Sequence, residues 1–248
     1  MSDFMASVLF VFPHPDDESF GPGPALARLR REGHAVHLLT LTRGEATSQR
    51  ERLGYSKEEM GAVRAREMEA VAGALDLSSL TVLQYPDGEL AAGDPLALEA
   101  TIEEHVEARR PDVVVTYPVH GISGHPDHLV THAVVKRVVA KRWRDGRAVP
   151  RRLAFFVLPP TDGDRPEHLQ STPEAAIGAC MAVTDDDLAR GHAALACYET
   201  YAPVIEAQQP LQQVTDGVCF QLWGEAAGPR RTHLLEQLPV TVSAPAYA

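Results

Sequence analysis

The stretch SVLFVFPHPDDE, Ser7 to Glu18, joins a short apolar segment to a dense polar one. Its first part, Ser7 to Pro13, contains β-branched and aromatic residues and has the length of a buried strand. Its second part, His14 to Glu18, places one imidazole and three carboxylates directly after that strand. Carboxylates packed this closely raise one another's pKa or require a counter-ion, and a divalent cation meets that need. The stretch therefore predicts a buried strand that ends in a metal site.

Short apolar segments alternate with helical patterns along the first 160 residues. This βαβαβαβαβ order predicts an α/β protein with a mostly parallel sheet and helices on both faces. In such a sheet, ligands bind beyond the carboxyl ends of the strands. The predicted strands are Ser7 to Pro13, Ala35 to Thr42, Leu80 to Tyr85, Val113 to Tyr117 and Arg152 to Leu158, and the predicted helices are Pro24 to Arg31, Lys57 to Leu77, Pro95 to Arg110 and Pro126 to Trp143.

The composition changes after Pro159, and residues 160–173 read as a long loop rich in Gly, Asp, Pro and Thr. No internal repeat is visible. We therefore expect a single domain over residues 1–248, with a core of residues 1–160 and a C-terminal elaboration of residues 161–248. The elements predicted in the elaboration are a short strand at Cys180 to Thr184, a helix from Asp185 to about Tyr198 and a last strand at Asp216 to Trp223.

A second polar cluster, GHPDH over Gly124 to His128, follows the strand predicted at Val113 to Tyr117 and opens a helix. Pro126 suits the first position of that helix. His128 and His132 are four residues apart, so both can lie on one helix face. The first and fourth strands are neighbours at the switch point of the common doubly wound order. Both clusters are therefore expected at one edge of the sheet.

Together the two clusters resemble the signature motifs of the PIG-L/LmbE-like deacetylases, which are Rossmann-like zinc hydrolases that remove the acetyl group from N-acetylglucosamine derivatives. The similarity extends over roughly residues 7 to 140. It includes Thr42 to Glu45, the pair Arg64 and Glu67, and Pro86 to Gly88. The resemblance implies a Rossmann-like three-layer sandwich with a mostly parallel sheet and a C-terminal elaboration.

The resemblance also implies a ligand set for the metal. His14, Asp17 and His128 would bind it, with positions left open for water as a catalytic zinc requires. Zn²⁺ is the expected ion, while Fe²⁺, Mn²⁺ and Co²⁺ stay open because histidine and aspartate bind several of these metals. We interpret His132 as a packing residue.

Three further residues match the acid–base positions of the family. Asp16 would be the general base that takes a proton from the attacking water. A protonated His125 would stabilise the oxyanion and then donate a proton to the leaving amine, and Asp127 would hydrogen-bond His125 and keep it cationic. Some members carry a tyrosine where this chain has Ser123, so either another donor such as Tyr117 serves or the metal and His125 suffice.

The positions of Arg64 and Asp87 correspond to residues that contact substrate hydroxyls, and Glu45 is expected beside them as a third substrate contact. Residues 43–45 are equally compatible with a plain strand-to-helix turn.

Charge and composition restrict the partners. With 23 Lys and Arg against 34 Asp and Glu, the net charge is −11, which disfavours binding to nucleic acid. A hydrophobic share of 44% is ordinary for a globular protein, and no apolar run approaches the ~18 residues of a membrane helix. We expect no signal peptide, three unpaired cysteines, a cytoplasmic location and no membrane or nucleic-acid partner. Homo-oligomerisation stays open.

The resulting hypothesis is a zinc-dependent N-deacetylase acting on a small amino-sugar substrate, as in the biosynthesis of low-molecular-weight thiols. One alternative is a zinc amidase acting on another amide, such as a thiol conjugate or an antibiotic glycoside. An alternative of another class is a nucleotide-binding Rossmann oxidoreductase, to which the sequence Gly21-Pro22-Gly23 gives weak support. A metal-binding module without activity would not need Asp16, His125 and Asp127.

Overall fold

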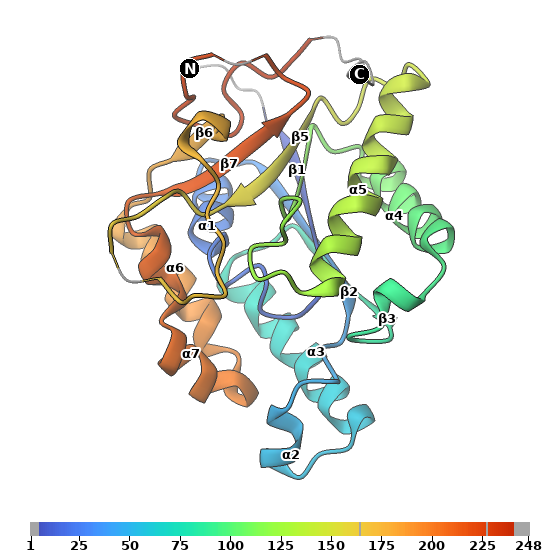
Figure 1. Ribbon diagram of the computed structural model, residues 1–248, viewed down its shortest axis with the longest axis vertical. Helices are drawn as coiled ribbons and strands as arrows, with labels where there is room; N and C mark the ends of the chain where they lie inside the picture. Colours follow the sequence, from blue (N-terminus) through green and yellow to red (C-terminus); the bar gives the residue numbers. More distant parts are fainter. Residues whose placement is uncertain (1–4, 164, 227, 241–248) are drawn as a thin grey trace.

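A mostly parallel sheet of seven strands forms the centre of the computed structural model, which describes residues 5–163, 165–226 and 228–240 (Figure 1). The strand order is β3-β2-β1-β4-β5-β7-β6. The first five strands run parallel, whereas β7 is antiparallel to both β5 and β6. The strands are β1 (Ser7–Phe12), β2 (Ala35–Thr42), β3 (Ser79–Tyr85), β4 (Val113–Thr116), β5 (Arg152–Val157), β6 (Ala179–Met181) and β7 (Val218–Trp223).

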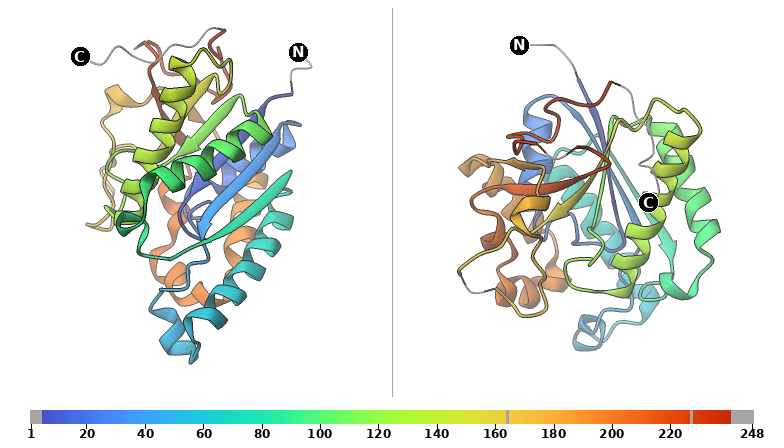
Figure 2. Two further views of the ribbon diagram at one scale, coloured as in Figure 1. Left: turned by 90° about the vertical axis from the view of Figure 1, so that its right-hand side faces the viewer. Right: turned by 45° about the horizontal axis from the view of Figure 1, so that its top comes forward.

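Helices cover both faces of this sheet and complete a three-layer sandwich (Figures 1 and 2). The α-helices are α1 (Gly23–Arg31), α2 (Gln49–Leu53), α3 (Lys57–Ala74), α4 (Pro95–Arg109), α5 (Pro126–Arg144), α6 (Asp185–Ala196) and α7 (Ala202–Gln208), and short 3₁₀ turns occur at Leu90–Ala92, Glu174–Ala176, Glu199–Tyr201 and Pro210–Val214.

Strand β1 shows how the two faces are built, because its side chains alternate between two apolar clusters. Phe10 and Phe12 pack in the cluster that includes residues of α1, α3 and α6. Leu9 and Val11 pack in the cluster that includes residues of α4 and α5. The strand is buried on both sides, which explains its continuous apolar sequence.

The helices begin at residues suited to their N-termini. Ser56 and Glu59 form a capping box at α3, and Thr184 and Asp187 form another at α6. The Asp94 carboxylate caps α4 and is followed by a proline at the first helical position. Helix α5 likewise starts with a proline. It follows β4, which pairs with β1, so its N-terminus lies at the carboxyl edge of the sheet.

The predicted elements of the core are confirmed, with ends shifted by at most three residues. The strands and the helix predicted in the elaboration are also present, although the strand predicted at Cys180 to Thr184 lies at Ala179–Met181. Helices α2 and α7 were not predicted. Within the described residues, no helix combines the length and the apolar character that crossing a membrane requires.

The cysteines require a correction. The sequence predicts three unpaired thiols, but Cys180 and Cys219 form a disulfide and only Cys197 is free. The two bonded residues lie directly opposite each other in the antiparallel pair β6–β7, with Cα atoms 4.1 Å apart. Their separation of 39 residues hides this pairing, since the strand register is set by the fold and not by sequence spacing.

Candidate active site

The HPDDE loop turns sharply where β1 ends. Asp16 adopts a left-handed backbone conformation with φ 86°, which aspartate tolerates better than most residues. Its carbonyl accepts hydrogen bonds from the amides of Ser19 and Phe20 at 2.8 and 2.9 Å. The amide of His14 donates to Oδ2 of Asp17 at 2.9 Å. These bonds fix the loop so that the His14 and Asp17 side chains face the same edge of the sheet.

The second cluster is brought to that edge by the loop before α5. Gly121 has φ 62°, and a Cβ at this position would lie 2.8 Å from the Cβ of His128, so glycine is needed there. The Nδ1 of His128 lies 2.9 Å from the Gly121 carbonyl and donates to it. This bond fixes the tautomer of His128 and leaves the lone pair of its Nε2 free.

Asp17 lies between the two histidines predicted to bind metal. Its Oδ1 is 3.4 Å from Nε2 of His128, and its Oδ2 is 3.5 Å from Nδ1 of His14. The hydroxyl of Tyr117 donates to Oδ1 at 2.7 Å, and its ring stacks on His128 with centroids 4.1 Å apart. Burial alone would raise the pKa of Asp17, but His128 and the hydrogen bonds from His14 and Tyr117 lower it to about 2.

Asp127 contacts a different histidine from the one predicted. Its Oδ2 lies 3.2 Å from Nε2 of His14, and its two oxygens accept bonds from the amides of Gly88 and Leu90 at 2.9 and 3.1 Å. Asp87 Oδ1 lies 3.2 Å from the same nitrogen of His14. The expected hydrogen bond from His125 to the Asp127 carboxylate is not among the contacts of the described residues. Asp127 instead orients His14, which turns Nδ1 toward Asp17.

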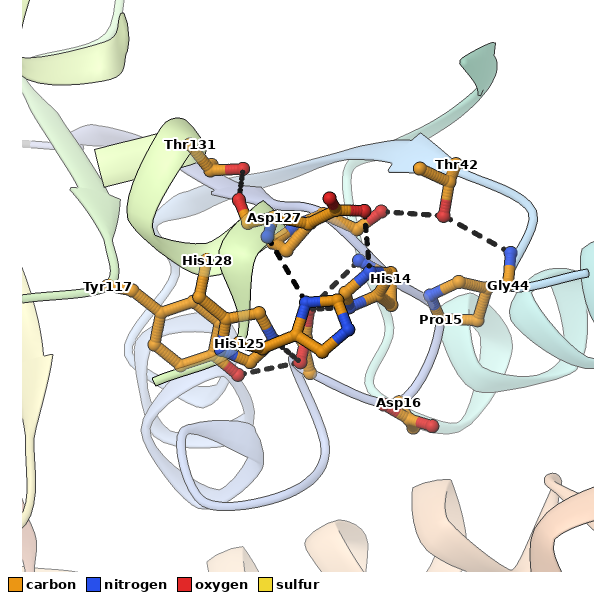
Figure 3. Close-up of polar contacts among 12 residues, drawn as sticks. His14, Pro15, Asp16, Thr42, Gly44, Tyr117, His125, Asp127, His128 and Thr131 are labelled. Carbon is orange, nitrogen blue, oxygen red and sulfur yellow. Dashed lines mark hydrogen bonds and ion pairs between the residues drawn. The ribbon is translucent and has the colours of Figure 1, made fainter. Parts of the chain in front are cut away.

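His125 caps the N-terminus of α5 and is exposed at the mouth of the site. Its Nδ1 accepts a bond from the amide of Asp127 at 3.2 Å, so a neutral ring carries its proton on Nε2. Burial and the nearby His14 lower the pKa of His125. Asp127 acts in the opposite direction on this pKa, and the cationic state expected of His125 stays a prediction. Figure 3 shows His14, His125 and His128 gathered together, with Asp16 apart from them.

Asp16 is held from two sides. Its Oδ2 accepts a hydrogen bond from Nη2 of Arg64 at 2.6 Å, and its amide donates to the hydroxyl of Tyr198 at 2.8 Å. Burial raises the pKa of Asp16 to about 6, although Arg64 acts in the opposite direction. Arg64 is 2% exposed, donates to the Pro15 carbonyl and packs 4.6 Å from the ring of Tyr201. The guanidinium is thus engaged mainly by the HPDDE loop.

The other two predicted substrate contacts, Asp87 and Glu45, are joined by a hydrogen bond at the turn of residues 86–88. Oδ2 of Asp87 accepts a bond from the Ala46 amide at 2.7 Å, and the Asp87 amide donates to Oε1 of Glu45 at 3.0 Å. Arg64 and Asp87 line the cavity described below, whereas Glu45 is not among the described residues that do so. Its position is that of a support for Asp87.

A cavity of about 440 Å³ opens over this edge of the sheet. The predicted ligands His14, Asp17 and His128 all line it, as do Asp16, His125 and Ser123. Ser123 Oγ lies 3.5 Å from Nδ1 of His128, so the residue that replaces the family tyrosine is present at the site. Tyr117 directs its hydroxyl at Asp17 and not into open space.

The donor chemistry fits a divalent metal. Nε2 of His128 and Nδ1 of His14 each present a lone pair to the Asp17 carboxylate, and such acceptors repel one another unless a cation or a proton lies between them. Burial acts to lower the pKa of His14, but its hydrogen bonds to Asp127, Asp17 and Asp87 raise it. Ligand atoms also lie within 4.8 Å of one another in the sets His14, His125, His128 and His14, Asp87, Asp127.

Sequence reasoning missed the contribution of the C-terminal elaboration. Tyr198 and Tyr201 reach the site from the end of α6, and Thr200 between them bonds both carboxylate oxygens of Glu67 on α3. Tyr198 also donates to Glu18 at 2.7 Å. The cluster of two tyrosines in YETY was the available signal, but nothing in its spacing indicated which strand end it would contact.

The part of the chain that contains both the HPDDE and the HPDH loops matches a known protein family. Residues 9–139 match the family model described as GlcNAc-PI de-N-acetylase. A relative from Kineococcus radiotolerans, named 1D-myo-inositol 2-acetamido-2-deoxy-alpha-D-glucopyranoside deacetylase, is 35% identical over 179 residues, which are 59% of this chain and 50% of that protein. The chain spans about half the length of the first curated relatives it matches.

Solved structures share the whole fold. The A40926 pseudoaglycone deacetylase Dbv21 superimposes with a TM-score of 0.66 at 20% identity over 91% of this chain and all of that one. GalB from Pseudomonas putida, a 4-carboxy-2-hydroxymuconate hydratase, reaches 0.67 at 16% identity over 90% and 98%. Because these two neighbours carry different activities, the fold by itself does not decide the reaction.

Proposed function

The chain belongs to the GlcNAc-PI de-N-acetylase family, and on that basis we propose that it is a metal-dependent hydrolase that removes the acetyl group from an N-acetylglucosamine-type substrate. The observation that carries the proposal is the meeting of the HPDDE and HPDH loops at the carboxyl edge of β1 and β4. There, Asp17 lies between the free lone pairs of His14 and His128 in a cavity.

We assign the metal to His14, Asp17 and His128. Asp127 orients His14 through Nε2, and the Gly121 carbonyl orients His128 through Nδ1, which is the support that metal-binding histidines usually have. A divalent ion, with Zn²⁺ the first candidate, supplies Lewis-acid polarisation and lowers the pKa of water when bound. The same donors also accept Fe²⁺, Mn²⁺ or Co²⁺.

We assign the acid–base steps to Asp16 and His125, which both line the cavity. Asp16 accepts the proton of the attacking water, and a pKa near 6 suits a base that operates near neutral pH. For this step His125 acts as the imidazolium: it offers Nε2–H to the oxyanion, gives that proton to the departing nitrogen and returns to the neutral ring, while the proton taken by Asp16 is released to solvent. Water adds to the acetamide carbonyl, the C–N bond breaks, and the products are acetate and a free amine. Asp16→Ala is expected to lower kcat by about 10²- to 10⁴-fold.

The remaining predicted residues support this chemistry. Asp87 lines the cavity and is the first candidate to bind a sugar hydroxyl, with Glu45 holding its turn. Arg64 acts chiefly on Asp16, and the part of its surface that lines the cavity is available to substrate. Ser123 replaces the family tyrosine as a short hydroxyl donor at the mouth.

Two alternatives differ in substrate or class. A zinc amidase acting on another amide would use the same residues, and a substrate panel separates it. A nucleotide-binding oxidoreductase is disfavoured because three carboxylates follow β1, where a pyrophosphate needs free N–H groups. The predicted cytoplasmic location stays a prediction, and the Cys180–Cys219 bond counts against it because disulfides persist mainly in oxidising compartments.

The decisive experiment measures metal content and acetate release together. Protein purified without a His tag is analysed for metals and assayed on a panel of N-acetylglucosaminides before and after chelation. About one ion per chain, with acetate release that chelation abolishes and metal restores, is the expected result. Folded protein that takes up no divalent metal would overturn the site, and metal-loaded protein that releases acetate from no sugar would favour the amidase.

A further inference from the structure

The cavity continues beyond the proposed catalytic residues. Its catalytic end lies at the carboxyl ends of β1 and β4, where His14 and Tyr117 line it. Phe156 and Leu158, at the end of the neighbouring strand β5, line it further along the same edge. The volume of about 440 Å³ lies in the range of pockets that bury drug-sized ligands.

Apolar side chains from separate segments line this second part, together with the polar side chains of His168, Gln208 and Gln213. Phe156 and Leu158 form one side, Phe20 of the β1–α1 loop and Leu169 of the long loop another, and Val204 of α7 a third. Phe20, Leu169 and Val204 are only half-buried. Apolar side chains that keep surface open toward a cavity favour an apolar ligand group, since its burial removes surface of both partners from water.

A close approach of backbone to ring shapes the floor of this region. A Cβ at Gly21 would lie 2.4 Å from Cζ of Phe156, so the absence of a side chain at Gly21 allows the ring to lie where it does. Gly21 belongs to the sequence that gave weak support to a nucleotide-binding loop. In the structure, the lack of a side chain at this glycine leaves room for the Phe156 ring in the cavity wall.

The charges on the lining disfavour an anionic ligand. Three carboxylates line the cavity, those of Asp16, Asp17 and Asp87. Among the described lining residues Arg64 is the one lysine or arginine, and it is paired with Asp16 at 2.6 Å. Arg165 reaches the rim only through Gln213, to whose Oε1 its Nε donates at 2.9 Å. Away from the proposed metal, a phosphate or carboxylate would therefore meet no unpaired lysine or arginine among the described lining residues.

Resting on the proposed deacetylase function, we propose that the cavity holds an apolar subsite, formed by Phe20, Phe156, Leu158, Leu169 and Val204, that takes an uncharged apolar aglycone of the amino-sugar substrate. Four of these five residues lie beyond residue 139, where the match to the family model ends. The part of the chain outside the family match thus supplies the substrate preference, while the matched part supplies the chemistry.

The test compares three substrates that differ only in the group on the sugar: phenyl and methyl N-acetylglucosaminides, in both anomeric forms, and N-acetylglucosamine 1-phosphate. We expect kcat/KM for the better phenyl anomer to exceed that for the methyl compound by about 10- to 100-fold, the gain from burying one ring. The phosphate is expected to be the poorest of the three. Binding of phenyl and methyl glucosides, which lack the amide, is measured in parallel by calorimetry.

A charged substitution in the wall of the subsite provides a second test, in which the direction of the change in rate is predicted for each substrate. Val204→Lys places a cation in the apolar subsite without touching the proposed catalytic residues, and its long stem can keep the helix packed. It should remove most of the phenyl preference and raise the relative rate on the phosphate. Ala207→Lys, on an exposed position of the same helix outside the cavity lining, should change neither. Leu169→Ala replaces Val204→Lys if that variant does not fold, and should lower the phenyl preference severalfold.

The outcomes separate the subsite from the activity. Equal kcat/KM on all three substrates, or a preference for the phosphate in the unmodified chain, overturns the apolar subsite and leaves the deacetylase intact. Acetate release from none of them overturns the proposed function. In that case calorimetry decides the subsite: tighter binding of the phenyl glucoside than the methyl glucoside supports it, and equal binding overturns it.

Discussion

At the scale of single residues, Asp127 shows how one buried carboxylate can prepare a metal ligand. Its oxygens bind two backbone amides, of Gly88 and Leu90, and the ring of His14. The amides hold the carboxylate in place, and the carboxylate holds the proton of His14 on Nε2. Nδ1 is then free to face Asp17. The ionised state of Asp127 is therefore part of the metal site even though Asp127 is not assigned as a ligand.

We predict that Asp127→Asn lowers metal affinity by about 10- to 100-fold, the usual effect of losing such an orienting carboxylate. The amide can still fill the space but removes the charge that fixes the His14 tautomer. Competition with a metal-binding dye measures the affinity. Asp162→Asn, on an exposed loop residue, is the matched control. Unchanged metal affinity in Asp127→Asn would contradict the proposed role of the Asp127 charge in orienting His14.

The residue scale also shows what sequence could and could not predict about the site. The approach of His14 to His128 across more than a hundred residues was predictable, because parallel strands bring their carboxyl ends to one edge. The partner of Asp127 was not predictable. The carboxylate lies in the first turn of α5, two residues after His125, but the amides of Gly88 and Leu90 bind it on the side of His14.

At the scale of elements, the segment after α6 fastens the catalytic loop to the rest of the molecule. Tyr198 accepts a hydrogen bond from the amide of Asp16 and donates one to Glu18. Thr200 bonds Glu67 on α3, the helix that also carries Arg64. The same short segment therefore positions the backbone of the HPDDE loop and helix α3, whose Arg64 binds the Asp16 carboxylate.

We predict that Tyr198→Phe lowers kcat by about 10-fold or more, since small displacements of a catalytic group are costly, and leaves KM little changed. The substitution keeps the ring but leaves the Asp16 amide without its acceptor. Metal content should stay at the unmodified level, because the assigned ligands are untouched. Tyr55→Phe is the control, as that tyrosine does not line the cavity. A rise in KM at constant kcat would instead assign Tyr198 to substrate binding.

A second element-scale prediction concerns the junction of α1 and α6. Asp187 completes the capping box of α6 and accepts two bonds from Arg31, at 3.0 and 2.8 Å. Burial would raise the pKa of Asp187, but Arg31 and Thr184 lower it below its usual value. A lowered folded-state pKa means that the ionised group stabilises the fold above its unfolded pKa of about 3.9. That contribution is lost as the pH falls through the folded-state value.

Asp187→Asn should therefore lower the free energy of unfolding by about 1–2 kcal/mol at pH 7, from the loss of a cap and a charged hydrogen bond. The deficit should shrink below about pH 4, where Asp187 of the unmodified chain begins to bind a proton in the unfolded state, and should vanish as the pH falls through the folded-state pKa. Urea unfolding at pH 7 and at lower pH measures both values. Asp186→Asn, one residue earlier and exposed, should show neither effect. A deficit independent of pH would indicate a packing effect and not a charge effect.

Strands and helices were predicted correctly where the local sequence pattern is sufficient to define them. Mainly apolar runs predicted β1, β2 and β5, because these strands are largely buried. The antiparallel course of β7 and its pairing with β5 and β6 depend on contacts far apart in sequence, so neither the pairing nor the Cys180–Cys219 bond could be predicted. Helix α2 has five residues, too few for periodicity to be recognised.

At the scale of the whole molecule, the core and the elaboration share one sheet and one apolar cluster. Strand β7 of the elaboration pairs with β5 of the core from Cys219 to Trp223. Phe220 lies in the same apolar cluster as Phe10 and Leu26. A boundary near residue 160 would therefore cut through a sheet and a core, which is the physical argument for the predicted single domain.

The two tryptophans test this prediction directly. Trp143 on α5 of the core and Trp223 on β7 of the elaboration stack with ring centroids 5.3 Å apart, and the chain contains no others. Their fluorescence therefore reports the junction between the two parts, whereas far-UV circular dichroism reports all the helices and strands. If the chain is one cooperative unit, both signals should change at the same denaturant concentration.

A Trp223→Phe variant sharpens the test, because its remaining fluorescence comes from Trp143 alone. For a single domain we expect its transition to coincide with its own circular dichroism, at a midpoint slightly below that of the unmodified chain. A fluorescence change that precedes the loss of secondary structure in the unmodified chain would mean that β7 separates from the core first. Because Tyr198 and Val204 lie in the elaboration, such separation would also release the Asp16 loop and open the apolar subsite. Activity measured across the same denaturant range would then disappear with the fluorescence signal and before the circular dichroism signal.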